Sequence, residues 1–119
     1  MTPQKMPTKI PNFQHCMQLM RDRNPNRQEE GFHQLLPCAG RFVHELMEEF
    51  RSETDYGLKC WLLELIGQAR SPHAFDLLVE QLSVGNLSYR DWAIIGLQKL
   101  NTKEAQKILA ERGFSDFRK

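Results

Sequence analysis

The chain has 119 residues, a formal net charge of +1 and 40% hydrophobic residues. This length suits one domain, and a charge near zero provides no general field that would attract nucleic acid or a membrane surface. No apolar run approaches the ~20 residues of a membrane-spanning helix, and the N-terminus lacks the apolar stretch of a secretion signal. We therefore expect a cytoplasmic protein without a membrane partner, whose three cysteines are free thiols.

The start of the chain combines a flexible segment with a short helix. Three prolines fall within residues 1–11, which predicts a flexible segment ahead of a single domain over residues 12–119. Asn12 is a good N-cap for a helix that reaches Asp22, with Phe13, Cys16, Met17 and Met20 on one face. We expect this helix to cover one end of the core; a methionine-rich surface for a partner is the alternative.

Two helices are predicted next. The pair Asn24-Pro25 begins a helix that extends to Leu36 and is weakened by Gly31. A second helix is predicted over Cys38–Ser52. Its buried stripe comprises five apolar side chains at helical spacing: Phe42, Val43, Leu46, Met47 and Phe50.

Four more helices are predicted in the remainder of the chain. Residues 57–82 form two antiparallel helices, with Thr54 or Asp55 as a cap before the first and Ser71-Pro72 at the start of the second. Gly85 and Asn86 end that pair, and Ser88 caps the following helix with Asp91 in a capping-box position. Asn101-Thr102 starts the last helix, Gly113 ends it, and Phe114 and Phe117 are expected to fold back over it.

The chain aligns with itself when Trp61 is placed on Trp92. The same shift places Lys59 on Arg90 and Ser71 on Thr102, so both helices of a hairpin and the cap between them recur. A weaker copy lies upstream: Phe32, Leu35, Val43, Leu46 and Met47 align with Leu63, Ile66, Ala74, Leu77 and Leu78. A period of roughly 30 residues with two helices in each unit is typical of an α-solenoid.

The repeated residues resemble those of bacterial HEAT-like, or armadillo-type, repeats over roughly residues 26–111. The resemblance is carried by Leu58-Lys59 and Tyr89-Arg90, by Leu65-Ile66-Gly67, and by the spacing of Ala74, Leu77 and Leu78. It implies an all-α fold, a short α-solenoid of about three HEAT-like helical hairpins with terminal capping helices. It says little about function, because such repeats serve in binding proteins, scaffolds and a few enzymes.

Acidic residues are concentrated in residues 28–64, which carry a balance of −5. In a HEAT-like solenoid the second helices of successive hairpins line the concave side. That arrangement would place acids, two apolar anchors and a histidine on one partner-binding surface: Glu45, Glu48, Glu49, His73, Phe75, Asp76, Val79 and Glu80. Such a surface suits a basic protein and repels phosphate backbones. The alternative is that these are the solvated faces of two helices.

No catalytic or cofactor motif is present in the sequence. It has no glycine-rich phosphate loop and no nucleophile elbow, and His44 with its neighbouring glutamates lacks the second histidine of a metal-binding helix. We therefore expect no cofactor, no metal and no enzymatic activity. The hypothesis is a monomeric or weakly self-associating protein-binding module, most concretely an immunity or antitoxin-like protein that neutralises a basic toxin domain.

Three alternatives remain open: a scaffold or adaptor subunit of a larger complex, an accessory enzyme of the HEAT-like lyase type, and a nucleic-acid-binding protein. HEAT-like repeats occur in phycobilin lyases and in alkylpurine DNA glycosylases. The basic N-terminal segment, with a balance of +4 over residues 1–27, is the one feature that favours nucleic acid.

Overall fold

The computed structural model describes residues 10–115, and every regular element in that range is helical. Two compact units are distinguished, Met1–Cys38 and Ala39–Lys119. The predicted flexible segment falls outside the described residues except for Ile10 and Pro11, and so does Phe117. The single domain over residues 12–119 stays a prediction. Among the described helices, none combines the length and the apolar character needed to cross a bilayer.

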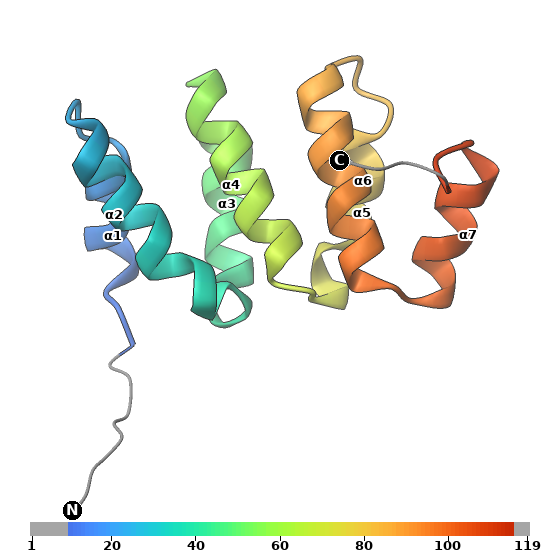
Figure 1. Cartoon of the computed structure of the whole chain (residues 1–119), viewed down its shortest axis with the longest axis horizontal. Helices are drawn as coiled ribbons and strands as arrows, with labels where there is room; N and C mark the ends of the chain where they lie inside the picture. The colour runs from blue at the N-terminus through green and yellow to red at the C-terminus, as the bar shows by residue number, and fades with distance from the viewer. Residues whose placement is uncertain (1–9, 116–119) are drawn as a thin grey trace, which may run out of the picture. The chain divides into compact units, whose positions relative to one another are not determined.

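In the first unit, helix α1 (Phe13–Met20) packs against α2 (Pro25–Leu35), as Figure 1 shows. The side chain of Asn12 caps α1 as predicted, accepting a hydrogen bond from the His15 backbone at 2.9 Å. A Cβ atom placed on Gly31 would lie only 2.5 Å from the carbonyl oxygen of Cys16. Gly31, expected only to weaken α2, is therefore the residue that allows the two helices to approach so closely.

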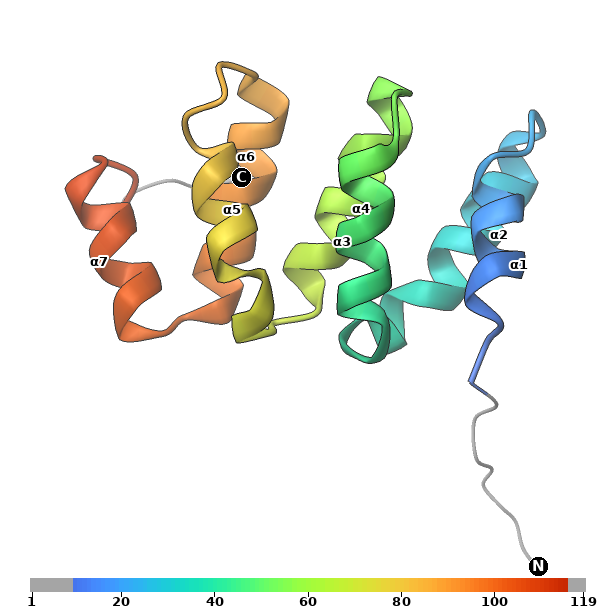
Figure 2. The same ribbon diagram turned by 180° about the vertical axis from the view of Figure 1, so that it is seen from behind.

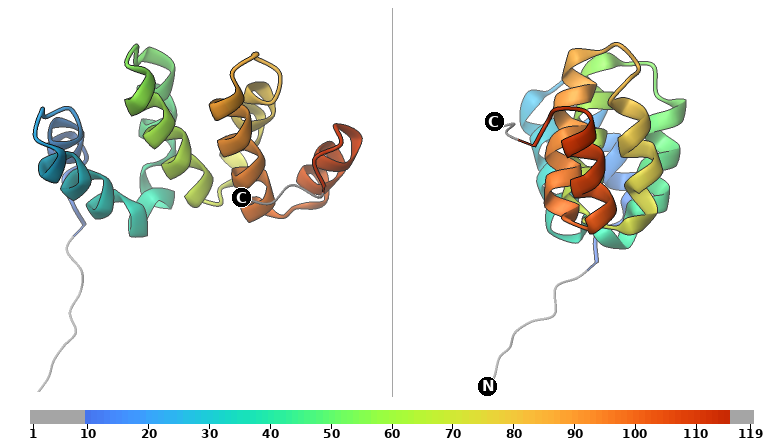
Figure 3. Two further views of the ribbon diagram at one scale, coloured as in Figure 1. Left: turned by 45° about the horizontal axis from the view of Figure 1, so that its top comes forward. Right: turned by 90° about the vertical axis from the view of Figure 1, so that its right-hand side faces the viewer.

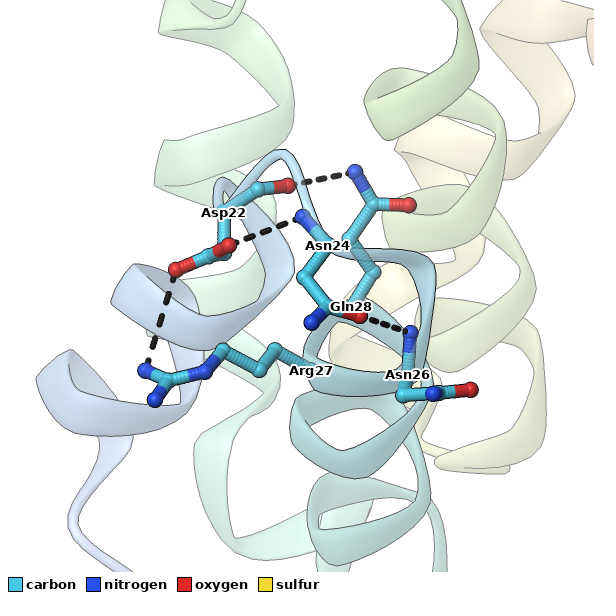
Figure 4. Close-up of polar contacts among 5 residues, drawn as sticks. All are labelled: Asp22, Asn24, Asn26, Arg27 and Gln28. Carbon is cyan, nitrogen blue, oxygen red and sulfur yellow. Dashed lines mark hydrogen bonds and ion pairs between the residues drawn. The ribbon is translucent and has the colours of Figure 1, made fainter.

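The turn between α1 and α2 is held by side chains that replace missing backbone partners (Figure 4). Asp22 accepts a hydrogen bond from the backbone of Asn24 at 2.8 Å and forms a 3.8 Å ion pair with Arg27. Asn24 in turn accepts from the backbone of Asn26, and the amide of Gln28 donates to the carbonyl oxygen of Asp22. The predicted start of α2 at Asn24-Pro25 is confirmed.

The segment after α2 differs from the prediction. Residues Leu36–Phe42 form a 3₁₀ helix, η1, that is interrupted at Cys38 (φ −123°, ψ 23°), and α3 comprises only Val43–Ser52. The helix predicted from Cys38 was therefore placed five residues too early. Pro37 and Gly40 are poor interior helix residues, which explains why the continuous helix does not extend back to Cys38.

The second unit continues with α4 (Tyr56–Gln68), the 3₁₀ turn η2 (Pro72–Ala74), α5 (Phe75–Gln81), α6 (Leu87–Leu100) and α7 (Lys103–Glu111). Helix α4 packs between α3 and α6, and α6 contacts α5 and α7 as well. Within this unit, α4 and α6 lie side by side in Figure 1 with α3 and α5 behind them, and Figure 2, seen from behind, shows α3 and α5 in front. The second unit thus has two layers of helices, which are also seen end-on in Figure 3.

The centre of the second unit is the crossing of α4 and α6. Leu62, Leu63 and Ile66 of α4 and Ile94 and Leu97 of α6 are fully buried there. The backbones of the two helices meet at two glycines: a Cβ atom on Gly67 would lie 2.9 Å from the Cα atom of Gly96. Gly96 also leaves room for Leu78 of α5, whose Cδ2 would lie 3.1 Å from an added Cβ.

Helix starts in the chain follow the spacing of the sequence repeat. Asn24, Asp55 and Asn86 each cap a helix through a side-chain oxygen, and they are separated by the same interval as Trp61 and Trp92. The predicted cap at Asp55 is confirmed. The cap predicted at Ser88 is wrong, because Asn86 adopts the extended conformation and accepts from the Tyr89 backbone at 3.0 Å.

Two turns in the second unit share the same backbone conformation. Arg70 (φ 51°) and Asn101 (φ 56°) are the non-glycine residues with positive φ among the described residues, and they too occupy equivalent positions of the repeat. The next residues, Ser71 and Thr102, cap η2 and α7 as predicted. After α7, the ring of Phe114 lies 5.6 Å from the guanidinium of Arg90, so Phe114 does return to α6.

A lysine joins three helices at one edge of the core. Lys59 of α4 donates to the carbonyl oxygen of Phe50 at 2.8 Å and lies 4.2 Å from the centre of the Phe50 ring. That carbonyl belongs to the last turn of α3, where no intrahelical donor remains. Tyr89 of α6 completes the cluster, and its ring stacks on that of Tyr56. Burial raises the pKa of the Tyr89 hydroxyl, with smaller contributions from Cys60 and Tyr56.

We predict opposite effects for two Gly→Ala substitutions in α4. Gly67→Ala should lower the free energy of unfolding by about 1–3 kcal/mol, because the new methyl group overlaps the backbone of α6. Gly57→Ala should raise it by up to about 1 kcal/mol, because the nearest atom is 3.6 Å away and alanine is the better helix former. Urea unfolding of both variants measures the difference. A neutral Gly67→Ala would contradict the close crossing.

The lysine cluster gives a second prediction. Lys59→Met keeps most of the apolar stem but leaves the Phe50 carbonyl oxygen without its donor, so the free energy of unfolding should fall by about 1–2 kcal/mol. Lys107→Met on exposed α7 is the matched control and should change stability little. Equal effects of the two substitutions in urea unfolding would show that the cluster is not a stabilising contact.

Candidate functional site

Helix α3 and the η2–α5 segment form one continuous surface of the second unit (Figure 2). Two contacts between side chains join them. The rings of His44 and His73 lie 4.8 Å apart, and the guanidinium Nη2 of Arg51 lies 2.9 Å from Oε1 of Glu80. We call this surface the α3–α5 face and define it by its six exposed polar side chains: His44, Glu48, Arg51, His73, Asp76 and Glu80.

Helical spacing determines which acids of α3 belong to this face. His44 and Arg51, which touch the η2–α5 segment, are seven residues apart, and Glu48 lies between them on the same stripe. Glu45 and Glu49 lie about 100° around the helix from His44 and Glu48. Glu45 is exposed and Glu49 is half-buried. The structure therefore places Glu48 beside α5, whereas Glu45 and Glu49 form a neighbouring stripe of α3.

The η2–α5 segment contributes its own acids because its opposite side is buried. Ala74, Leu77, Leu78 and Gln81 are enclosed against the rest of the unit, which leaves Asp76 and Glu80 exposed one turn apart. Phe75 and Val79, the two predicted apolar anchors, are half-buried on the stripe next to them. His73 is exposed and occupies the start of the segment, where Ser71 accepts its backbone N–H.

The α3–α5 face is acidic but contains one cation. Arg51 neutralises part of the charge of Glu80, which leaves Glu48 and Asp76 as its other carboxylates. The two ionic side chains are about half exposed, at 52% and 51%, so this pair contributes little to stability. The pair shows which edge of α3 lies next to α5. The sequence analysis did not include Arg51 or the contact of His44 in this surface. Their seven-residue spacing alone indicates that both lie on the same face of α3.

The described residues offer limited material for catalysis. Within residues 10–115, no group of three or more histidine, cysteine, aspartate or glutamate side chains is placed to hold a metal ion. His44 and His73 make a pair of rings without a third ligand of that kind. In the first unit, burial raises the pKa of the Cys16 thiol, and its Sγ lies 3.5 Å from Oε1 of Gln34. A buried, protonated thiol is a weak nucleophile.

Comparison with known proteins identified no relative of the chain. No protein-family model, curated protein or solved structure matches the chain. The α3–α5 face brings Glu48, His73, Asp76 and Glu80 of the predicted surface together, and its role in binding stays a prediction.

Proposed function

We propose that the chain is a non-enzymatic protein-binding module whose α3–α5 face binds a basic protein. The observation that carries this proposal is that neighbouring helices, far apart in sequence, present Glu48, Asp76 and Glu80 together with one compensating cation. Opposite charge on a partner speeds encounter and fixes its orientation. Half-buried Phe75 and Val79 beside the acids supply apolar area that such an interface can bury.

The proposal includes the finer architecture, a short α-solenoid of HEAT-like hairpins with terminal capping helices. Its support is the regular spacing of helix caps and of the two left-handed turns, which follows the sequence repeat. Solenoids use extended surfaces made by equivalent helices for binding. In the most concrete version, the protein is cytoplasmic and immunity or antitoxin-like, and it occupies the basic substrate surface of a toxin domain such as a nuclease.

One observation favours the second candidate, a scaffold or adaptor. Tyr56, Val84 and Leu87 are large apolar side chains that are at least half exposed, at 51%, 50% and 67%. Tyr56 and Leu87 are the first residues of α4 and α6, so the same end of both helices is apolar. Exposed apolar residues can mark a protein interface.

Charge reversal on the α3–α5 face tests the main candidate. The tagged chain should retain a basic protein from its native host, and the purified pair should bind with one-to-one stoichiometry. The variant Glu48→Lys/Asp76→Lys should weaken that binding at least about tenfold, because each lysine repels the partner's positive surface. Glu104→Lys/Glu111→Lys on exposed α7 makes the same change in net charge and should bind like the wild type.

Isothermal titration calorimetry of the wild type and these variants with the partner, repeated at raised salt, measures whether the acids of the α3–α5 face carry the binding. Binding that weakens with salt only when Glu48 and Asp76 are intact supports the proposal. If both double variants bind the partner as tightly as the wild type, the acids are merely solvated. If Tyr56→Ser/Leu87→Ser abolishes binding instead, the scaffold candidate replaces it.

A further inference from the structure

A hollow of about 600 Å³ lies where α4 and α6 end, and none of its lining residues belongs to the α3–α5 face. Six residues line it: Arg70, Ile95, Gln98, Lys99, Leu100 and Asn101. All belong to the second unit and come from the turn after α4 and from the last turns of α6. The hollow is open to solvent rather than enclosed, so a bound molecule would stay partly exposed.

The charge of this hollow is positive. Arg70 and Lys99 are its charged residues, and its lining includes no carboxylate. In the part of the chain that the structure describes, neither cation forms an ion pair. The C-terminal ends of α4 and α6 each add about half a negative charge, which two full positive charges exceed. The local field therefore favours an anion.

The neutral lining residues suit the same kind of ligand. Oδ1 of Asn101 accepts a hydrogen bond from Nε2 of Gln106 at 2.7 Å, and the Nδ2 group of the same amide can donate to a ligand. Ile95 and Leu100 are half-buried and give the hollow an apolar portion. Donor groups and aliphatic surface in the same hollow fit an anionic group attached to an apolar stem.

The backbone of Arg70 is an independent indication that its side chain matters. Arg70 is left-handed (φ 51°), a conformation that glycine adopts without strain and that a residue with a Cβ atom adopts at a cost. The equivalent residue one repeat later is Asn101, and asparagine tolerates this conformation. The chain therefore has an arginine where glycine would be the less strained choice, and its side chain lines the hollow.

We propose that this hollow binds a small organic oxyanion, a carboxylate or a phosphate monoester, with Arg70 as its main ligand and Lys99 as the second cation. The planar guanidinium of Arg70 can donate two parallel hydrogen bonds to such a group. The amide of Asn101 adds a neutral donor, and the apolar stem of the ligand packs on Ile95 and Leu100. The site shares no lining residue with the proposed protein-binding face.

Titration of the ¹⁵N-labelled chain with three aromatic probes tests the proposal. Phenyl phosphate or phenylacetate should shift the backbone signals of residues 98–101 saturably, with a dissociation constant below about 10 mM. Benzyl alcohol, the neutral control, should bind at least about tenfold more weakly. Saturable shifts with only one of the two anions identify whether the site takes a phosphate or a carboxylate. Saturable shifts with both support binding of oxyanions in general. No saturation by either anion, or equal binding of the alcohol, overturns the proposal.

Two variants and a control connect the binding to the residues named. Arg70→Gly should lower the affinity for the responding anion at least about tenfold while leaving the thermal midpoint unchanged or higher, because glycine relieves the backbone strain. Lys99→Gln should weaken binding in the same direction, whereas Lys107→Gln on exposed α7 should not. Undiminished binding to a folded Arg70→Gly variant would contradict the assignment.

Discussion

The contact on which the second unit depends is the backbone crossing of α4 and α6 at Gly67 and Gly96. Helices usually pack with their axes about 8–10 Å apart because side chains separate them. Two facing glycines remove that separation, and Leu78 of α5 fills the space beside Gly96. The crossing therefore positions α5 directly and α3 through its packing on α4. The α3–α5 face forms because α3 packs on α4 and α5 packs on α6, and the crossing holds α4 and α6 together.

The cap residues show what sequence alone predicts well. Asn12, Asn24, Asp55, Ser71 and Thr102 were all expected to begin helices and do so, because capping depends on local hydrogen bonds. The prediction that Ser88 caps α6 was wrong for a local reason as well. Asn86 lies two residues earlier and is an equally good cap, so residue type alone does not decide which of the two begins the helix.

The packing glycines show what sequence does not reveal. Gly31 and Gly67 look like ordinary helix-weakening residues until the opposing backbones are known. The same limit applies to the candidate surface. Its acids could be named from helical spacing, but the partners of His44 and Arg51 come from a segment far along the chain and require the tertiary fold. The division of Glu48 from Glu45 and Glu49 follows only from those contacts.

The two proposed sites carry opposite local charge within the same unit. Acids gather on the α3–α5 face, and two cations line the hollow at the ends of α4 and α6. A net charge of +1 conceals this difference, because opposite local charges cancel in the sum. We propose that each surface selects a different ligand, the α3–α5 face a basic protein and the hollow a small anion.

Hydrogen–deuterium exchange of the chain with and without its basic partner tests the central claim most directly. The account predicts that added protection is concentrated in Val43–Ser52 and in residues 72–81, with little change in α7. Protection concentrated instead at the exposed first turns of α4 and α6, with α3 and α5 unchanged, would contradict the assignment of the binding face.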